Sequence, residues 1–246
     1  MPAFFTRSAT VGILPKNKKR ETRKIEKGSI INYVSYTALK GIVTLTNTDG
    51  DVYTMDGSAV VLKDVKGKIQ YPTKVRLAVP YFSQLDNRLN PTVTCNITCV
   101  AMCLRFLGVQ GNGDGQLEDQ LNLWLTANEL DRYNHEHLRL IFIDKGIKNI
   151  FKTNSNIEEI KEHLARGYPV IIAGWFTAAG HIVTAVGYDE NGLLVHDPNG
   201  EWYDWGYEVN DDRNGHTAGQ FVHYSYKLIN RLCNDSGIWA HFPSRN

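Results

Sequence analysis

The chain has 246 residues, of which 42% are hydrophobic and 22% charged, and its formal net charge is +1. This length allows one large domain, or a medium domain with a small one, and the hydrophobic content is sufficient for a core. Because 27 basic residues are balanced by 26 acidic ones, nothing in the charge calls for a nucleic acid or an anionic membrane as partner. The sequence has no apolar run of the ~18 residues that a transmembrane helix needs, and its first residues do not resemble a signal peptide.

The first 78 residues divide into three parts by composition. Residues 1–27 end in a basic run that Glu21 and Glu26 interrupt, which favours a solvated tail over a nucleic-acid-binding arm. Residues 28–65 contain short segments rich in Ile, Val, Tyr and Thr, separated by turn signals, and this pattern predicts a small all-β barrel of SH3-like size. Residues 66–78 are predicted to be a linker, because Gly67 and Pro72 interrupt any regular pattern.

The segment Thr94-Cys95-Asn96-Ile97-Thr98-Cys99-Val100-Ala101-Met102-Cys103-Leu104 is predicted to form a buried helix, since its apolar residues recur at helical spacing. Cys95 falls in the first turn, where unpaired backbone N–H groups and the helix dipole favour a thiolate. Cys99 and Cys103 follow along the same helix and are predicted to be core residues. A small buried cysteine is the alternative interpretation of Cys95 itself, and Cys233 has no assigned role. With three cysteines on one helix face, free thiols and a reducing compartment are expected.

No metal or cofactor is predicted. The glycine-rich turn at residues 111–115 lacks the ligand spacing of an EF-hand calcium loop. His135 and His137 are two residues apart, so on a helix they would not share a face, and ligation of a metal by this pair is not favoured.

The second half of the chain changes from helical to strand patterns. Asn156, with Glu159 three residues later, marks the start of a helix that ends near Gly167 and Pro169. Strands are then predicted at residues 170–175, 181–188, 193–196 and 221–228. This order predicts an α+β domain. The Asn191-Gly192 turn predicts a hairpin that brings His181 and Asp197 side by side, as a base and its orienting carboxylate require.

Five segments in this order resemble the papain-like cysteine peptidases of the C39-like family. They are Val79-Pro80-Tyr81-Phe82-Ser83-Gln84, the Cys95 segment, Gly167-Tyr168-Pro169-Val170, Gly180-His181 through Gly187-Tyr188-Asp189, and Asp197-Pro198-Asn199-Gly200. The resemblance implies a papain-like peptidase domain over residues 79–246. Many relatives have Gly-Pro after the nucleophile, where this chain has Asn96-Ile97; the difference affects the subgroup more than the chemistry.

The resemblance also implies a role for each site residue. Cys95 would be the nucleophile, His181 the general base and then acid, and Asp197 the group that orients His181. Gln84 would donate from its side chain to the oxyanion hole, together with the backbone N–H of Cys95. Other interpretations exist for each: Gln84 as a loop residue, His181 as a buried strand histidine, and Asp197 as a turn former.

The expected activity is that of a cysteine peptidase or amidase that cleaves a peptide bond through a thioester acyl-enzyme. A small SH3-like domain ahead of a papain-like domain resembles phage lysins, so a peptidoglycan stem peptide is the expected substrate and the SH3-like domain a possible cell-wall binder. The expected location is the host cytoplasm before lysis, or the virion. The alternatives are a proteinase that processes a protein precursor, a papain-like module that binds peptides without cutting them, and a structural virion component.

Overall fold

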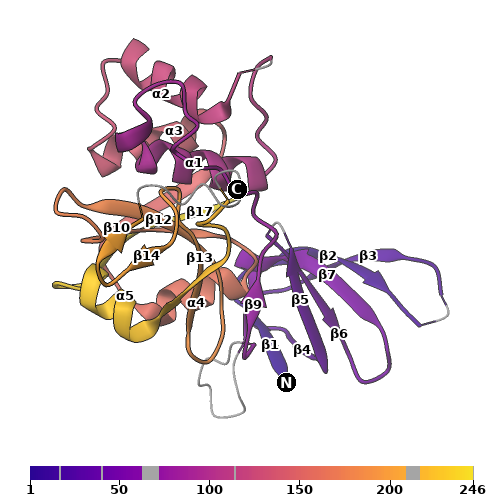
Figure 1. Ribbon diagram of the computed structural model, residues 1–246. Helices are drawn as coiled ribbons and strands as arrows, with labels where there is room; N and C mark the ends of the chain where they lie inside the picture. Colours follow the sequence, from indigo (N-terminus) through magenta and orange to yellow (C-terminus); the bar gives the residue numbers. More distant parts are fainter. Residues whose placement is uncertain (17, 40, 63–71, 114, 209–216, 246) are drawn as a thin grey trace.

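The computed structural model describes residues 1–16, 18–39, 41–62, 72–113, 115–208 and 217–245. Its larger part is built on an antiparallel sheet in the strand order β10-β17-β11-β12-β13-β16, with β9 also paired to β12. Helices cover both faces of this sheet: α1, α2 and α3 lie above it in Figure 1, and α4 and α5 lie below. The strands of this sheet are β9 (Val75–Arg76), β10 (Lys148–Ser155), β11 (Val170–Gly174), β12 (His181–Tyr188), β13 (Gly192–His196), β16 (Val222–Ser225) and β17 (Ile238–Ser244). The helices are α1 (Cys95–Phe106), α2 (Leu117–Ala127), α3 (His135–Asp144), α4 (Ile157–Ala165) and α5 (Tyr226–Cys233), preceded by a 3-10 turn, η2 (Pro91–Val93).

Helix α1 is the centre of this module and packs on β12. Its residues from Asn96 to Leu104 are all buried, which is unusual for a helix and reflects helices on one side and the sheet on the other. The hydrophobic core extends from Val75 to Phe242 and includes the side chains of Cys99 and Cys103. The segment predicted as a buried helix is therefore the main packing element, and the α+β character of the module is confirmed.

Several of the elements that follow α1 agree with the sequence patterns, whereas strands β10 and β17 are not among the predicted ones. Asn156 caps α4, its side chain accepting a hydrogen bond from the Glu159 backbone N–H at 3.0 Å. β12 begins at His181 and pairs with β13 across the Asn191-Gly192 turn, as predicted. The strand predicted at residues 221–228 ends at Ser225, whose hydroxyl caps α5 by accepting from the Leu228 N–H at 3.1 Å.

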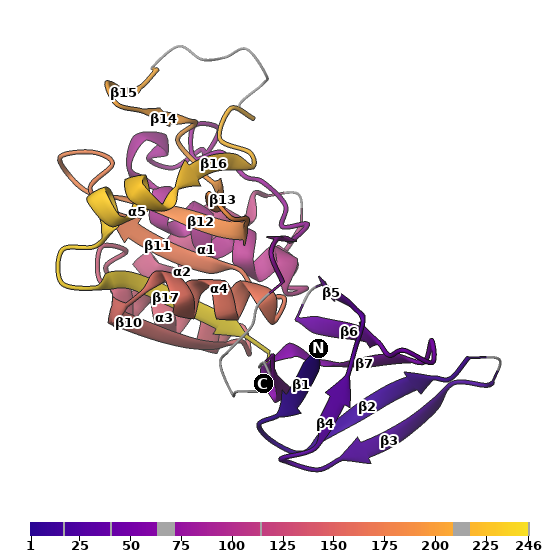
Figure 2. The same ribbon diagram turned by 90° about the horizontal axis from the view of Figure 1, so that it is seen from below.

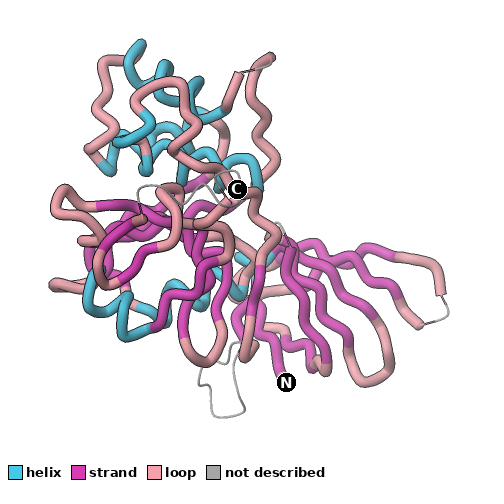
Figure 3. The backbone as a smooth tube through the Cα atoms, in the orientation of Figure 1, coloured by secondary structure: helices cyan, strands magenta, loops and turns pink. Residues whose placement is uncertain are grey.

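The N-terminal 62 residues form a second, all-β part with a core of its own. A five-stranded sheet has the order β3-β2-β7-β6-β5, and a three-stranded sheet has the order β4-β1-β8. Figure 3 shows this part as strands and loops beside the main sheet, and Figure 2 shows it from below. Its elements are β1 (Pro2–Phe5), β2 (Ala9–Leu14), β3 (Glu21–Ile25), β4 (Ile30–Asn32), β5 (Ser35–Leu39), β6 (Ile42–Thr46), β7 (Val52–Asp56), η1 (Gly57–Ala59) and β8 (Val60–Leu62).

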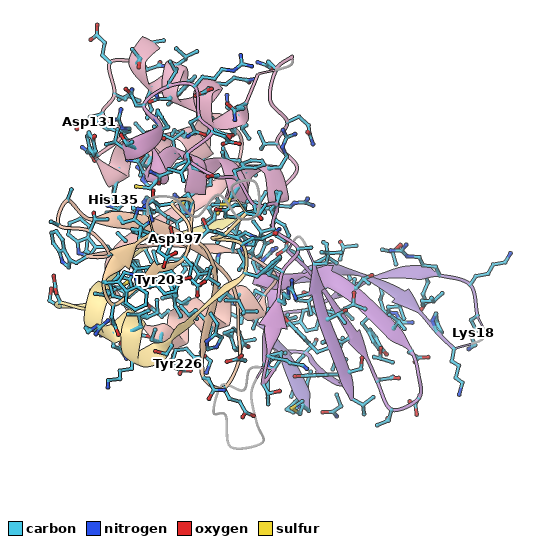
Figure 4. All side chains as sticks on the ribbon, in the orientation of Figure 1. Lys18, Asp131, His135, Asp197, Tyr203 and Tyr226 are labelled. Carbon is cyan, nitrogen blue, oxygen red and sulfur yellow. The ribbon has the colours of Figure 1, made fainter. Side chains whose placement is uncertain are left out.

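The prediction of a solvated tail over residues 1–27 is wrong. Three strands occupy this segment, and Val11 and Ile13 of β2 point into the N-terminal core. The basic run lies at the turn between β2 and β3 and on β3 itself; Figure 4 shows Lys18 at its outer tip. The sheets of this part remain open among the residues that the structure describes, so the SH3-like barrel stays a prediction. Residues 66–71 of the predicted linker lie outside the described residues.

The two parts of the chain meet at the turn between α4 and β11. The Gly41 N–H donates to the Gly167 carbonyl at 2.8 Å, and the Tyr168 hydroxyl donates to the Asp56 carboxylate at 3.2 Å. Gly57 is required here because a Cβ atom would lie 1.8 Å from the Arg166 carbonyl oxygen. Tyr168 is fully buried by this contact. The N-terminal part therefore rests directly on the peptide that leads into the central sheet.

Two short strands, β14 (Trp202–Tyr203) and β15 (Gly206–Tyr207), pair with each other as a separate antiparallel hairpin. Within the described ranges, no helix is both long and apolar enough to cross a membrane.

Candidate active site

Cys95 is the first residue of α1, and the chain enters the helix by a tight turn. Asn90 adopts a left-handed conformation (φ 55°), and η2 follows it immediately. The backbone N–H of a first helical residue has no partner within its helix, and the helix dipole places partial positive charge at the same end. The thiol of Cys95 therefore lies where a negative charge is stabilised.

The loop that leads to Cys95 is held by buried polar side chains. The Asn87 amide donates to the hydroxyls of Thr94 and Thr98, both at 2.9 Å. The Asp119 carboxylate on α2 accepts from the backbone N–H groups of Arg88 and Leu89 at 3.2 and 3.1 Å. Because buried hydrogen bonds to charged groups are the stronger ones, this network fixes the approach of the chain to α1.

His181 and Asp197 meet at the end of the β12–β13 hairpin. His181 begins β12, Asp197 follows the last residue of β13, and the distance from His181 Nε2 to Asp197 Oδ1 is 2.8 Å. Both side chains are buried, that of Asp197 completely. Since an imidazole has two ring nitrogens and Asp197 binds Nε2, Nδ1 is the nitrogen left for Cys95, to which His181 is also hydrogen-bonded. The structure thus joins Cys95, His181 and Asp197 by hydrogen bonds, with His181 in the middle.

The charges of Cys95, His181 and Asp197 stabilise one another. Burial raises the pKa of the Cys95 thiol, but the hydrogen bond and positive charge of His181 outweigh it, so the pKa is lowered overall. Burial lowers the pKa of His181, and the carboxylate of Asp197 outweighs that effect, so its pKa is raised. The two shifts agree in sign, and they favour a thiolate–imidazolium pair, which is the reactive form of a cysteine nucleophile.

The other cysteines lack these partners. Cys99 and Cys103 are fully buried, and burial raises the pKa of both thiols. The Cys99 thiol donates to the Ile182 carbonyl at 3.3 Å. Burial also raises the pKa of Cys233, to about 12, and its side chain forms part of the wall of the cleft beside Cys95. Only Cys95 combines a helix N-terminus with an imidazole.

Gln84 lies close to the Asp197 loop. Its backbone N–H donates to the Pro198 carbonyl at 2.8 Å, and its side-chain amide donates to the Pro91 carbonyl at 3.0 Å. The side chain is almost fully buried, and its Oε1 atom has no hydrogen-bond partner. An amide nitrogen carries two protons, so one N–H group remains for an oxyanion. Gln84 is not among the residues that line the cleft described next.

A cleft of about 450 Å³ opens beside Cys95 and His181. Three exposed aromatic side chains are among those that line it: Tyr133, Trp175 and Trp239. Trp175 is fixed by a hydrogen bond of 2.9 Å from its indole N–H to Asp235. An extended ligand in this cleft would lie between aromatic surfaces and beside the Cys95 thiol.

The two histidines of α3 have separate structural roles. His135 lines the cleft, where its Nδ1 contacts His241 Nε2 at 2.9 Å and its ring stacks on Phe151; Figure 4 shows it above the sheet. His137 Nδ1 accepts from the Asp131 N–H at 2.9 Å. Among the described residues no cluster of three or more His, Cys, Asp or Glu side chains could hold a metal ion.

Sequence patterns missed two residues of the site, Tyr207 and Tyr224. Each phenol donates to Asp197 Oδ2 at 2.8 Å. Tyr207 is on β15 and Tyr224 on β16, so their approach to Asp197 depends on long-range packing. A tyrosine after glycine in a polar segment carries no local signal of such a contact.

Comparison with known proteins gives two matches. The family described as Peptidase_C39 like family matches residues 76–233. A crystal structure described as that of a C39-like peptidase from Bacillus anthracis matches with a TM-score of 0.48 and 18% sequence identity, over 71% of this chain and 99% of that chain. No curated protein matches this sequence.

Proposed function

Because the chain belongs to the Peptidase_C39 like family, we propose that it is a cysteine peptidase in which Cys95 is the nucleophile. The observation that supports the proposal most directly is the hydrogen bonding of His181 to both Cys95 and Asp197. The distance from His181 to Asp197 is 2.8 Å. The thiolate would attack the carbonyl carbon of a peptide bond and form a tetrahedral intermediate. His181 would then give its proton to the leaving amine, leaving a thioester that water hydrolyses with His181 as base.

The negative oxygen of the tetrahedral intermediate needs donors near Cys95. We propose the free N–H of the Gln84 amide and the backbone N–H of Cys95 for this role. The burial of Gln84 and its hydrogen bonds to Pro91 and Pro198 would keep its amide in place. A single donor of this kind contributes on the order of 2.7–4 kcal/mol to catalysis.

For the substrate we propose the peptide part of bacterial peptidoglycan, cut by an endopeptidase or amidase of the phage-lysin type. The supporting features are a peptidase module joined to a separate all-β module with its own core, and the resemblance of this order to phage lysins. In this proposal the all-β module binds the cell wall, and the protein acts from the host cytoplasm at lysis or from the virion.

The test is release of soluble fragments from purified bacterial cell walls by the full chain, with C95A as the matched control. Mass spectrometry of the fragments identifies the bond: new amino groups on stem peptides indicate an endopeptidase, and peptides freed from muramic acid indicate an amidase. If no wall is solubilised but an unfolded protein substrate is cut, the protein-precursor alternative replaces the wall proposal. If neither is cut, the activity itself is refuted.

Binding by the all-β module is tested separately with the same inactive chain. C95A should sediment with purified walls, and it should do so less after charge reversal on β3, for example K24E. Failure of C95A to sediment with walls would contradict the wall-binding role without affecting the peptidase proposal.

A further inference from the structure

The carboxylate of Asp197 is held by more donors than its contact with His181 requires. Oδ1 accepts from His181 Nε2 at 2.8 Å and from the Asn199 backbone N–H at 3.0 Å. Oδ2 accepts from the hydroxyls of Tyr207 and Tyr224, both at 2.8 Å. An ionised carboxylate has about four lone-pair sites, so the four donors fill them all.

The two phenols come from different elements and are themselves fixed. Tyr224 on β16 is buried, stacks on Phe176 with ring centroids 5.6 Å apart, and its hydroxyl accepts from the Trp202 N–H at 2.9 Å. Tyr207 on β15 is half-buried, and its ring stands edge-on to that of His181 with centroids 5.4 Å apart. The donors are therefore placed before any substrate arrives.

We propose that Tyr207 and Tyr224 are positioning residues that act through Asp197 to hold His181 as an imidazolium facing Cys95. This inference rests on the proposed function of Cys95. Asp197 is fully buried, and an ionised group in such a site is stable only when hydrogen bonds replace the lost water. The phenols supply half of those bonds, and they prevent rotation of the carboxylate plane, so Oδ1 stays directed at Nε2.

If this is so, the stability of the Cys95 thiolate depends on the hydroxyls of Tyr207 and Tyr224, which do not contact it directly. Without them, Oδ2 would be buried and unpaired, and the carboxylate would turn away from His181 to find other donors. His181 would then lose its stabilising charge, and the thiolate of Cys95 would lose its imidazolium partner. The titratable groups that face this unit are Cys95 from α1, Tyr81 from the preceding loop, Tyr207 from β15 and Tyr224 from β16; Cys99 lies one turn along α1, and Glu201 faces Tyr224.

Tyr81 provides a matched control for the loss of a phenol hydroxyl near Asp197. Tyr81 donates its hydroxyl to the backbone carbonyl of Asp197, not to its carboxylate, at 2.9 Å. Y81F thus removes a phenol hydroxyl bonded to the same residue while leaving all four carboxylate donors in place. Y207F is the cleanest test variant, because no donor to the Tyr207 hydroxyl is present among the described residues, whereas Y224F also leaves the Trp202 N–H without its acceptor.

The experiment is the rate of Cys95 alkylation by iodoacetamide against pH, followed by mass spectrometry, for the parent, Y81F, Y207F, Y224F and the double Phe variant. We expect the midpoint of Cys95 labelling to rise by about one pH unit in the double variant and by less in each single Phe variant at 207 or 224. Y81F should keep the midpoint of the parent. In a D197N background, Y207F should cause no further shift, because the carboxylate through which it acts is gone.

The outcomes separate this inference from the function on which it rests. If the parent alkylates Cys95 only near the pKa of a free thiol, about 8.5, the nucleophile proposal fails. If the parent has a low midpoint and folded Y207F shares it, the positioning role is refuted. Equal shifts in Y81F and Y207F would also refute it, since they would show that any lost phenol near Asp197 has the same effect.

Discussion

At the scale of single residues, Asp197 has the clearest expected phenotype. Replacing it with Ala removes the charge that raises the pKa of His181, and with it the bond that sets the orientation of the imidazole. We expect turnover to fall by at least about tenfold while the fold is retained. Kinetics of the purified variant, with circular dichroism to verify folding, measure this. Turnover equal to that of the parent would remove Asp197 from the site and make Asn199 the next candidate.

The line of Cys95, His181 and Asp197 could be predicted from sequence because each partner carries a local signal. Cys95 precedes a buried helical pattern, and the Asn191-Gly192 turn sets the hairpin that aligns the other two. The phenols of Tyr207 and Tyr224 could not be predicted in this way. Their contact with Asp197 depends on the paths of two later segments, and nothing in their own surroundings distinguishes them from ordinary surface or core tyrosines.

At the scale of elements, the segment after β13 depends on one close approach. The Asp197 N–H donates to the Gly219 carbonyl at 2.9 Å, and a Cβ atom on residue 219 would lie 1.8 Å from the Asp197 carbonyl oxygen. We expect G219A to displace Asp197, lower the melting temperature and slow the alkylation of Cys95, because the backbone must separate. Q220A changes an exposed side chain in the same turn and should have neither effect. A G219A protein with the melting temperature and labelling rate of the parent would contradict this account of the turn.

The boundaries of elements show where periodicity is insufficient. Residues 221–228 contain β-favouring side chains, yet Ser225 ends the strand by capping α5. The composition of this segment is strand-like throughout, and the capping role of Ser225 becomes evident only where α5 begins in the folded chain. Strands β10 and β17 were missed because they pair with each other at the far side of the sheet, where polar and apolar residues alternate only in part.

At the scale of the whole molecule, the N-terminal part carries two conflicting patterns: its basic run is typical of a tail, whereas its alternating apolar residues indicate strands. Residues 9 to 14 alternate buried and more exposed side chains, as in a strand with one face on a core. The basic residues that suggested a tail lie on the outer face and turn of this same hairpin, where charge is compatible with a strand. Contact with the peptidase module was not foreseeable, since Gly41, Gly57 and Tyr168 meet only in the folded chain.

The stability of the whole molecule should decrease in acid because buried histidines, among them His163, His196 and His241, are held neutral. His196 Nε2 donates to the Val79 carbonyl at 2.9 Å while its Nδ1 accepts from the Phe221 N–H at 3.0 Å. His241 is similarly enclosed by Asn149 and His135, and His163 Nε2 donates to the Pro243 carbonyl at 2.8 Å. Burial lowers the pKa of His163 and of His196 to about 4 and that of His241 to about 3, from about 6.5 in an unfolded chain.

The sign of the effect follows from proton uptake. Below about pH 6.5 the unfolded chain binds protons at these three histidines and the folded chain does not, so the free energy of unfolding falls as pH falls, until the folded values near 4 and 3 are reached. Each histidine contributes roughly 1.4 kcal/mol per pH unit in that window. Burial raises the pKa of Glu118 to about 7, and the proton that the folded chain holds there offsets about one of the three histidines in the same window. The raised pKa of His181 also has the opposite sign to that of the buried neutral histidines, but its contribution is complete below its unfolded value and does not change there. Urea unfolding at several pH values should therefore show a loss of roughly 2–3 kcal/mol per unit between about pH 6 and 5. H196Q, which cannot take up a proton, should reduce that slope by about half, and an unchanged slope would show that His196 does not control acid stability.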